Sequence, residues 1–125
     1  FGSATTYDII NKNGHFIGGA IAPGIDVSAK YLFEKAALLQ KIDFKFPKYA
    51  IGKNTITNLQ SGIMLGGIDS INGMISRIKS ELNEPVETVV LTGGFSKILS
   101  PKIECPHILD KNLTIKGIKE IWDNN

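Results

Sequence analysis

Residues 56–82 carry the longest periodic pattern in the chain, and this pattern constrains the fold most strongly. Apolar side chains recur there at steps of three and four residues, which is the spacing of one face of an α-helix. They are Leu59, Ile63, Ile71, Met74, Ile75, Ile78 and Leu82. At 1.5 Å per residue the predicted helix is roughly 40 Å long, enough to cross a whole β-sheet. A chain of 125 residues has room for one modest core around such a helix, so we expect a single domain.

Four glycines interrupt this helix, namely Gly62, Gly66, Gly67 and Gly73. Each glycine in a helix interior costs about 1 kcal/mol relative to alanine, so tertiary contacts must compensate. Close packing against another helix and the close approach of a ligand are both consistent with this pattern. We favour close helix packing.

A β-hairpin is predicted over residues 6–21. Two apolar runs flank Asn13-Gly14, a dipeptide that tolerates the positive φ angles of a tight turn. Pro23-Gly24 follows the second run and should end the second strand. The hairpin is therefore expected to be antiparallel.

A helix should follow over residues 27–40, with Asp26 placed to cap its N-terminus. One face of this helix is apolar, and we expect it to be buried. Its residues are Val27, Tyr31 and either Ala37 or Leu38. Residues 41–54 then alternate apolar side chains and contain a proline and a glycine, which indicates an extended connector with a loop.

The C-terminal third alternates predicted strands and helices. The β-branched run from Thr88 to Thr92 is typical of a buried central strand, and Gly93-Gly94 marks a turn into a short helix. A further short strand is expected at residues 107–109, and a terminal helix over residues 113–122. The resulting order, β-β-α-α-β-α-β-α, predicts a layered α/β fold.

Composition argues against several classes of protein. The net charge is +2 and the lysines are scattered, with Arg77 the only arginine, so we expect no nucleic-acid partner. A run of about 18 apolar residues is missing, so we expect no membrane span. Cys105 is the only cysteine, which excludes an internal disulfide and favours the cytoplasm. We interpret it as a small apolar residue near a strand start, not as a nucleophile.

Two glycine-containing turns are candidate anion sites. Gly93-Gly94 follows a predicted strand, where backbone N–H groups of open α/β sheets can face an anion. The Gly-Ser-Ala-Thr-Thr stretch at residues 2–6 offers hydroxyls and amides that suit a phosphate or a metal-bound water. Thr55 stands directly before the long helix, so its hydroxyl either caps that helix or contacts a ligand.

These segments together resemble a known family. GSATTYD, GGAIAPGI, IGKNT, QSGIMLGG, LTGGFSKIL and LTIKGI, in this order, closely resemble the type III pantothenate kinases over essentially all 125 residues. That family belongs to the acetate and sugar kinase, heat-shock protein 70 and actin superfamily. The resemblance implies a ribonuclease-H-like (actin-like ATPase) domain, a mixed sheet flanked by helices. Residues 1–125 would be the C-terminal domain of a two-domain kinase, cut within an Asp-Phe-Gly-Thr-Ala-Thr-Thr motif, with the N-terminal domain absent.

The resemblance also implies which residues bind the substrates. Ser3 occupies the position of the first motif threonine and would contact ATP, since serine keeps the hydroxyl and the amide. Gly93 and Gly94 match the turn that adjoins the nucleotide, so they would also bind ATP. Thr55 matches the threonine that binds pantothenate.

No catalytic residue and no metal ligand are implied within the chain. The general base of the family lies in a Gly-x-Asp-Arg motif and its phosphate-binding turn in Asp-x-Gly-Asn, and neither occurs here. The aspartate for a monovalent cation would precede Phe1. Asp8, Asp26, Asp69 and the other carboxylates fit turns, caps or solvated faces, so the isolated chain should be inactive.

For the whole protein the resemblance implies ATP-dependent phosphorylation of pantothenate to 4′-phosphopantothenate, the first step of coenzyme A biosynthesis. Mg²⁺ would accompany ATP, and K⁺ or NH₄⁺ would assist. Family members are dimers, so the glycine-bearing helix is a candidate homodimer interface. A non-catalytic regulator similar to Bvg accessory factor and an autonomous nucleotide-binding or dimerisation module remain alternatives. The presence or absence of the two motifs in the other half would distinguish the kinase from the regulator.

Overall fold

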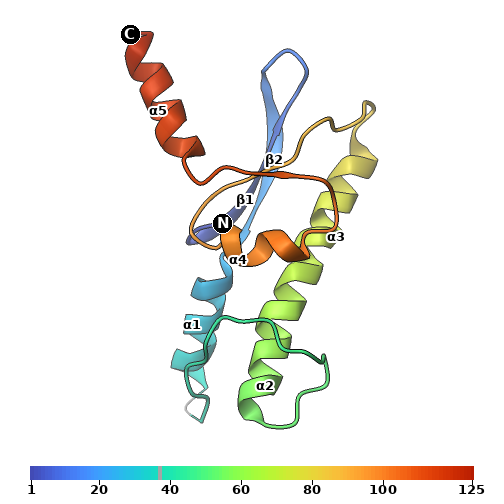
Figure 1. Cartoon of the computed structure of the whole chain (residues 1–125), viewed down its shortest axis with the longest axis vertical. Coiled ribbons are helices and arrows are strands. Elements are labelled where there is room, and N and C mark those ends of the chain that lie inside the picture. The colour runs from blue at the N-terminus through green and yellow to red at the C-terminus, as the bar shows by residue number, and fades with distance from the viewer. Residues whose placement is uncertain (37) are drawn as a thin grey trace. The chain divides into compact units, whose positions relative to one another are not determined.

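The fold combines strands and helices in two compact units. The computed structural model describes residues 1–36 and 38–125, and the two units are Phe1–Leu65 and Gly66–Asn125. The elements in chain order are β1 (Ala4–Ile10), β2 (Phe16–Pro23), α1 (Ile25–Lys35), α2 (Thr55–Gln60), the π-helical turn η1 (Ser61–Leu65), α3 (Gly66–Glu81), β3 (Val90–Leu91), α4 (Ser96–Leu99), the 3-10 turn η2 (Ser100–Lys102), β4 (Ile108–Leu109) and α5 (Leu113–Asp123) (Figure 1). This is the predicted order, because α2, η1 and α3 follow one another without a break. The mixed α/β class is therefore confirmed.

The first unit begins with the predicted hairpin. β1 pairs antiparallel with β2, and Thr6 lies opposite Ile21. In the turn between them Gly14 has a φ of 78°, which glycine adopts without strain. The Asn11 side chain accepts two backbone hydrogen bonds across this turn, each 3.0 Å long. β2 ends at Pro23, as predicted.

The start and the end of α1 differ from the prediction. The N-cap is Gly24, so no side chain caps the helix, and Asp26 lies inside the first turn. The prediction that Asp26 caps this helix is therefore wrong, because the helix begins before it. The helix ends at Lys35 and not near residue 40. Ala37, predicted to lie on the helix, is outside the described residues.

The apolar face of α1 is exposed. Val27 is 39% exposed and Tyr31 61%, and Leu38, beyond the helix end, is 96% exposed. The buried residue is Ala29, at 1%, on the opposite side of the helix. The prediction that the face with Val27 and Tyr31 is buried is therefore wrong. The face with the small residue Ala29 is the one that packs against the rest of this unit.

The connector before α2 is irregular, as predicted, and the next helical turns hold it in place. Gln60 is buried, and its Nε2 donates to the Asp43 carbonyl at 3.2 Å. Ser61 Oγ donates to the Ala50 carbonyl at 2.5 Å. Side chains at the end of α2 and the start of η1 thus fix two points of the preceding loop.

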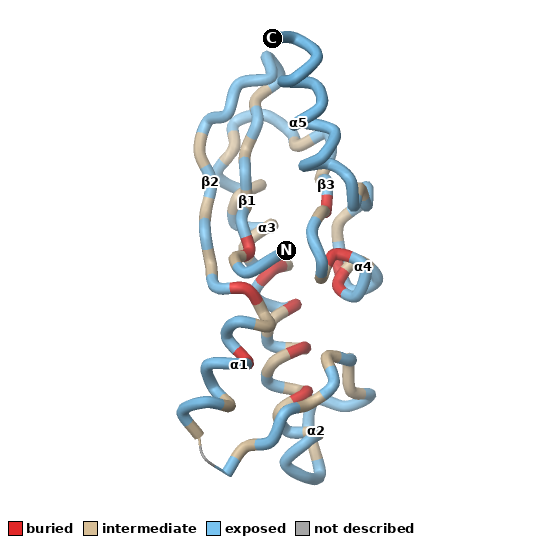
Figure 2. Tube along the Cα trace, turned by 90° about the vertical axis from the view of Figure 1, so that its left-hand side faces the viewer, coloured by how far each residue is buried: buried red, intermediate tan, exposed pale blue. Residues whose placement is uncertain are grey.

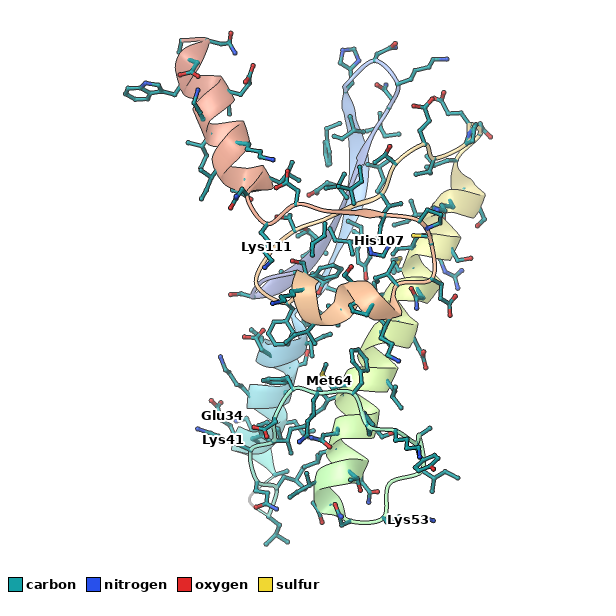
Figure 3. The ribbon with its side chains drawn as sticks, viewed as in Figure 1. Glu34, Lys41, Lys53, Met64, His107 and Lys111 are labelled. Carbon is teal, nitrogen blue, oxygen red and sulfur yellow. The ribbon has the colours of Figure 1, made fainter. Side chains whose placement is uncertain are left out.

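The long helix is present, but its buried face is shifted from the predicted one. The fully buried positions are Gln60, Met64, Ile68 and Ile71, with Met64 drawn in Figure 3. Of the predicted stripe only Ile71 is among them, and the others are half-buried. The buried positions are four, four and three residues apart, as on one face of an α-helix, and begin one residue after the predicted Leu59 and Ile63.

Three of the four helix glycines do not pack closely against the described chain. A Cβ atom built on Gly62, Gly66 or Gly73 would meet no atom within 4 Å. The preferred explanation, close helix packing, is therefore wrong for these three glycines within residues 1–36 and 38–125.

The strands of the second unit are shorter than predicted. β3 and β4 pair in parallel, with Val90 opposite Ile108 and Leu91 opposite Leu109. Leu91 is 4% exposed but Val90 is 43% exposed, so the prediction of a buried central strand over Thr88–Thr92 is wrong. In the described part of the chain β3 has one neighbouring strand, whereas a central strand needs two. β1 and β2 form a two-stranded sheet in the first unit, and β3 and β4 form another in the second unit.

Side-chain hydrogen bonds organise the segment between α4 and β4. Asn72 on α3 donates to the Lys102 carbonyl at 3.0 Å and accepts from the Glu104 N–H at 3.1 Å. The Asn72 amide thereby binds the backbone on both sides of the buried Ile103. Ser100 Oγ lies 2.7 Å from Nε2 of His107, which Figure 3 labels.

The terminal helix α5 is present as predicted and contains no buried residue. Figure 2 shows it exposed along its whole length. Cys105, before β4, is half-buried and has a free thiol. No helix within residues 1–36 and 38–125 is both long and apolar enough to cross a membrane.

Candidate functional site

Ser3 lies in a tight turn between the chain start and β1. The Gly24 N–H donates to the Ser3 carbonyl at 3.0 Å, and Gly2 donates to the Ala4 carbonyl at 3.0 Å. A Cβ on Gly24 would lie 2.8 Å from the Ser3 oxygen and closer still to that of Gly2, so position 24 requires glycine. Ser3 is exposed, and within the described ranges neither its hydroxyl nor its amide has a hydrogen-bond partner. These groups are free to bind an anion.

Gly93 and Gly94 form the predicted turn between β3 and α4. Gly93 has a φ of 96°, which explains the glycine at that position. Ser96 N and Ser96 Oγ both donate to the Gly93 carbonyl, at 3.1 Å and 2.6 Å. Gly94 is exposed, and a Cβ built on it would meet no atom within 4 Å. The turn therefore presents open backbone.

Thr55 is the first residue of α2 and does not cap it. The cap is Asn54, whose side chain accepts from Thr57 N at 2.9 Å, while Thr57 Oγ1 accepts from Asn54 N at 3.2 Å and from Lys53 N at 2.9 Å. The interpretation of Thr55 as an N-cap is therefore wrong. Thr55 is exposed, and its hydroxyl makes no hydrogen bond in the described part of the chain.

The predicted site residues lie on three separate segments of the chain. Ser3 and Thr55 belong to the first unit, where Ser3 directly precedes β1 and Thr55 is the first residue of α2 (Figure 1). Gly93 and Gly94 belong to the second unit. Ser3 and Thr55 each expose a hydroxyl group, and the Gly93-Gly94 turn exposes backbone.

Among residues 1–36 and 38–125, no three His, Cys, Asp or Glu side chains cluster in a way that could hold a metal ion. Asp26 Oδ2 accepts from Lys30 Nζ at 3.4 Å, while Oδ1 is buried without a partner among those residues. Asp8 and Asp69 are exposed, as expected for solvated faces.

Three groups have shifted pKa values, and burial lowers the pKa of the Phe1 ammonium. Burial raises the pKa of Tyr7 on β1. A hydrogen bond from the Lys116 ammonium and another from the Asn112 N–H lower the pKa of Asp110, directly before α5. None of the three groups lies at a predicted site residue.

Sequence reasoning missed Ser96 and the capping pair Asn54 and Thr57. The pair has a visible signal, since asparagine is a preferred N-cap and a threonine stands three residues later. For Ser96 the sequence offers only its spacing of three residues from Gly93. Its hydrogen bonds to the Gly93 carbonyl depend on the conformation of the turn.

Comparison with known proteins gives consistent matches. The model of the family "Type III pantothenate kinase" matches residues 1–77. A type III pantothenate kinase of Agathobacter rectalis is 43% identical over 122 residues, which are 98% of this chain and 47% of that protein. One of Moorella thermoacetica is 39% identical over 125 residues, covering 100% of this chain and 49% of the relative.

A solved structure also matches. It is a Campylobacter jejuni protein described as a Baf family transcriptional activator, with a TM-score of 0.67 and 27% identity. The match covers 99% of this chain and 55% of that one. The chain spans about half the length of the curated relatives it matches.

Proposed function

The chain belongs to the type III pantothenate kinase family, and on this premise we propose that it supplies substrate-binding turns of an ATP-dependent pantothenate kinase. The whole protein would phosphorylate pantothenate to 4′-phosphopantothenate, the first step of coenzyme A biosynthesis. The chain would be its C-terminal domain with a ribonuclease-H-like fold. The family membership and the α/β composition of the fold support this proposal.

The observation that carries the proposal is the open backbone at the Gly93-Gly94 turn. A phosphate group needs hydrogen-bond donors that the protein does not already use, together with space for its oxygens. Gly94 offers both, because its N–H has no partner within the described residues and a Cβ there would meet nothing within 4 Å. Ser3 has the same property, with a free hydroxyl and a free amide. We assign Ser3, Gly93 and Gly94 to ATP.

Thr55 is assigned to pantothenate. Its hydroxyl is exposed and is not needed by the helix, since Asn54 provides the cap. A hydroxyl can both donate to and accept from a polar substrate such as pantothenate.

Mg²⁺ would enter with ATP, and K⁺ or NH₄⁺ would assist as monovalent cation. The described residues include no cluster of three His, Cys, Asp or Glu side chains, so we assign no metal ligand among them. We assign no general base to this chain. Positioning of ATP and pantothenate is its proposed contribution, since phosphoryl transfer depends mainly on positioning and charge stabilisation.

A homodimer and a cytoplasmic location complete the proposal. On α3, Gly66 and Gly73 are exposed with open space around their α-carbons, which suits a helix that a second copy covers. Sedimentation of the full-length protein tests this assembly, and a monomer at micromolar concentration would contradict it.

The substitution Gly94→Ala in the full-length protein tests the ATP site. The position has open space and no positive φ, so the variant should fold. The added methyl group would stand where a phosphate oxygen meets the amide. Loss of one charge-assisted hydrogen bond raises the KM for ATP about tenfold or more, measured by pantothenate-dependent ADP release.

Gly117→Ala is the matched control, because it makes the same change in open space on α5 and should leave the KM for ATP unchanged. An unchanged KM in Gly94→Ala would refute the assignment of the turn. A wild-type protein without ADP release above background would refute the kinase proposal itself.

The second candidate is a non-catalytic regulator. The Campylobacter jejuni match, a protein described as a Baf family transcriptional activator, favours it. The other half of the protein discriminates, because a kinase needs Asp-x-Gly-Asn and Gly-x-Asp-Arg there. A full-length protein that lacks both motifs and releases no ADP would support the regulator.

A further inference from the structure

We propose that Ser96 is a positioning residue, which orients the Gly93-Gly94 peptide so that the Gly94 N–H faces the phosphates of ATP. This inference rests on the proposed function, because it takes ATP as the ligand of the turn. Ser96 is not among the residues that the family resemblance assigns to ATP.

The side chain of Ser96 is committed to one contact. Ser96 is 1% exposed, and its Oγ donates to the Gly93 carbonyl at 2.6 Å. Its backbone N–H donates to the same oxygen at 3.1 Å. Two donors therefore hold this carbonyl toward the buried side of the turn.

The direction of that carbonyl fixes the direction of the next amide. Carbonyl and N–H of one trans peptide point in opposite directions, and the described residues contain no cis peptide bond. With the Gly93 oxygen held against Ser96, the Gly94 N–H must point away from it. That N–H has no partner in the described part of the chain, and the residue is exposed.

The conformation of Gly93 makes this restraint necessary. Its φ of 96° lies in a region that glycine visits freely, but glycine also visits many others. Without the hydroxyl the peptide would keep one weaker restraint, the Ser96 N–H. The Gly94 amide would then face the ligand for a smaller fraction of the time, and ATP would bind less tightly.

The test compares Ser96→Ala, Ser96→Thr and wild type in the full-length protein by pantothenate-dependent ADP release. We expect Ser96→Ala to raise the KM for ATP about fivefold, the effect of one ordinary hydrogen bond, with the KM for pantothenate unchanged. Ser96→Thr keeps the hydroxyl and should restore a KM near that of wild type. A merely structural role would not shift one substrate alone.

Ser100→Ala is the matched control. It removes a hydroxyl in the same unit that contacts His107 and not the turn, so the KM for ATP should stay at the wild-type value. If Ser96→Ala does not fold, Ser96→Cys replaces it, because a thiol of similar size is a weak donor and should raise the KM in the same direction.

An unchanged KM for ATP in Ser96→Ala, or an equal rise in Ser100→Ala, would overturn this inference while wild-type activity stands. A wild-type protein that neither binds ATP in calorimetry nor releases ADP would overturn the proposed function, and this inference with it.

Discussion

Replacing Gly24 by alanine tests the close approach of the start of α1 to the turn that carries Ser3. The new Cβ would lie 2.8 Å from the Ser3 oxygen, whereas ordinary contact begins at 3.4 Å, so that backbone must move by 0.6 Å or more. The Gly2 oxygen lies closer still and must move further.

The free-energy terms have opposite signs but unequal sizes. Overpacking costs about 1–3 kcal/mol, and weakening the hydrogen bond from Gly24 N to Ser3 O costs up to about 1 kcal/mol. Reduced freedom of the unfolded chain offsets about 0.4–1 kcal/mol. We expect Gly24→Ala to lower the free energy of unfolding by about 2 kcal/mol.

Urea unfolding followed by far-ultraviolet circular dichroism measures this change. Gly117→Ala is the matched control, because its Cβ would stand in open space in the interior of α5. Alanine is favoured over glycine there by about 1 kcal/mol, so the same substitution should stabilise the chain. A Gly24→Ala variant as stable as wild type, or equal losses at both glycines, would refute the reasoning.

Three further measurements address other parts of the chain. Burial raises the pKa of Tyr7, so in a spectrophotometric titration one of the three tyrosines should ionise above the ordinary value of 10.0, and Tyr7→Phe should remove that late step. The Lys116 hydrogen bond lowers the pKa of Asp110 below 3.8, which stabilises the folded state above the unfolded pKa. Asp110→Asn should therefore unfold at lower urea than wild type at pH 7, with a difference that shrinks as the pH falls below 3.8; a pH-independent difference would contradict this. Asn54→Ala should cost about 1 kcal/mol in thermal unfolding and Thr55→Ala close to nothing, and equal losses would contradict the assignment of the cap.

Local signals predicted the elements well. The hairpin follows from Asn13-Gly14, whose preference for positive φ acts within four residues, and the structure confirms it at Gly14. The terminal helix and the strand–turn–helix around Gly93 follow from equally local patterns. Where a single residue type decides the backbone, the sequence is sufficient.

Burial depends on neighbours and was predicted less well. The run Thr88–Thr92 has the composition of a central strand, but only Val90 and Leu91 pair, with a single neighbouring strand in the described chain. Val27 and Tyr31 form an apolar face that nothing in the described residues buries. An apolar pattern shows that a face can be buried, and the partner that buries it lies elsewhere in the chain or outside it.

In the candidate site, too, the residue types could be predicted from the sequence but the contacts between residues could not. Ser3, Gly93 and Gly94 are positions whose residue types suit an anion, and the structure leaves them open. The restraint by Ser96 depends on a hydrogen bond across the turn, which no spacing rule predicts. The assembly of these places into one site stays a prediction, because they lie in two separate units.

The exposure of α5 determines what tryptophan fluorescence can report. Trp122 is the only tryptophan and is 82% exposed on a helix without a buried residue. Its indole is surrounded by water in the folded chain and in the unfolded chain alike, so its emission should change little when either unit unfolds. A blue shift on addition of another molecule would instead report that this helix has been covered. The residue is thus a poor probe of folding and a specific optical probe of association at α5.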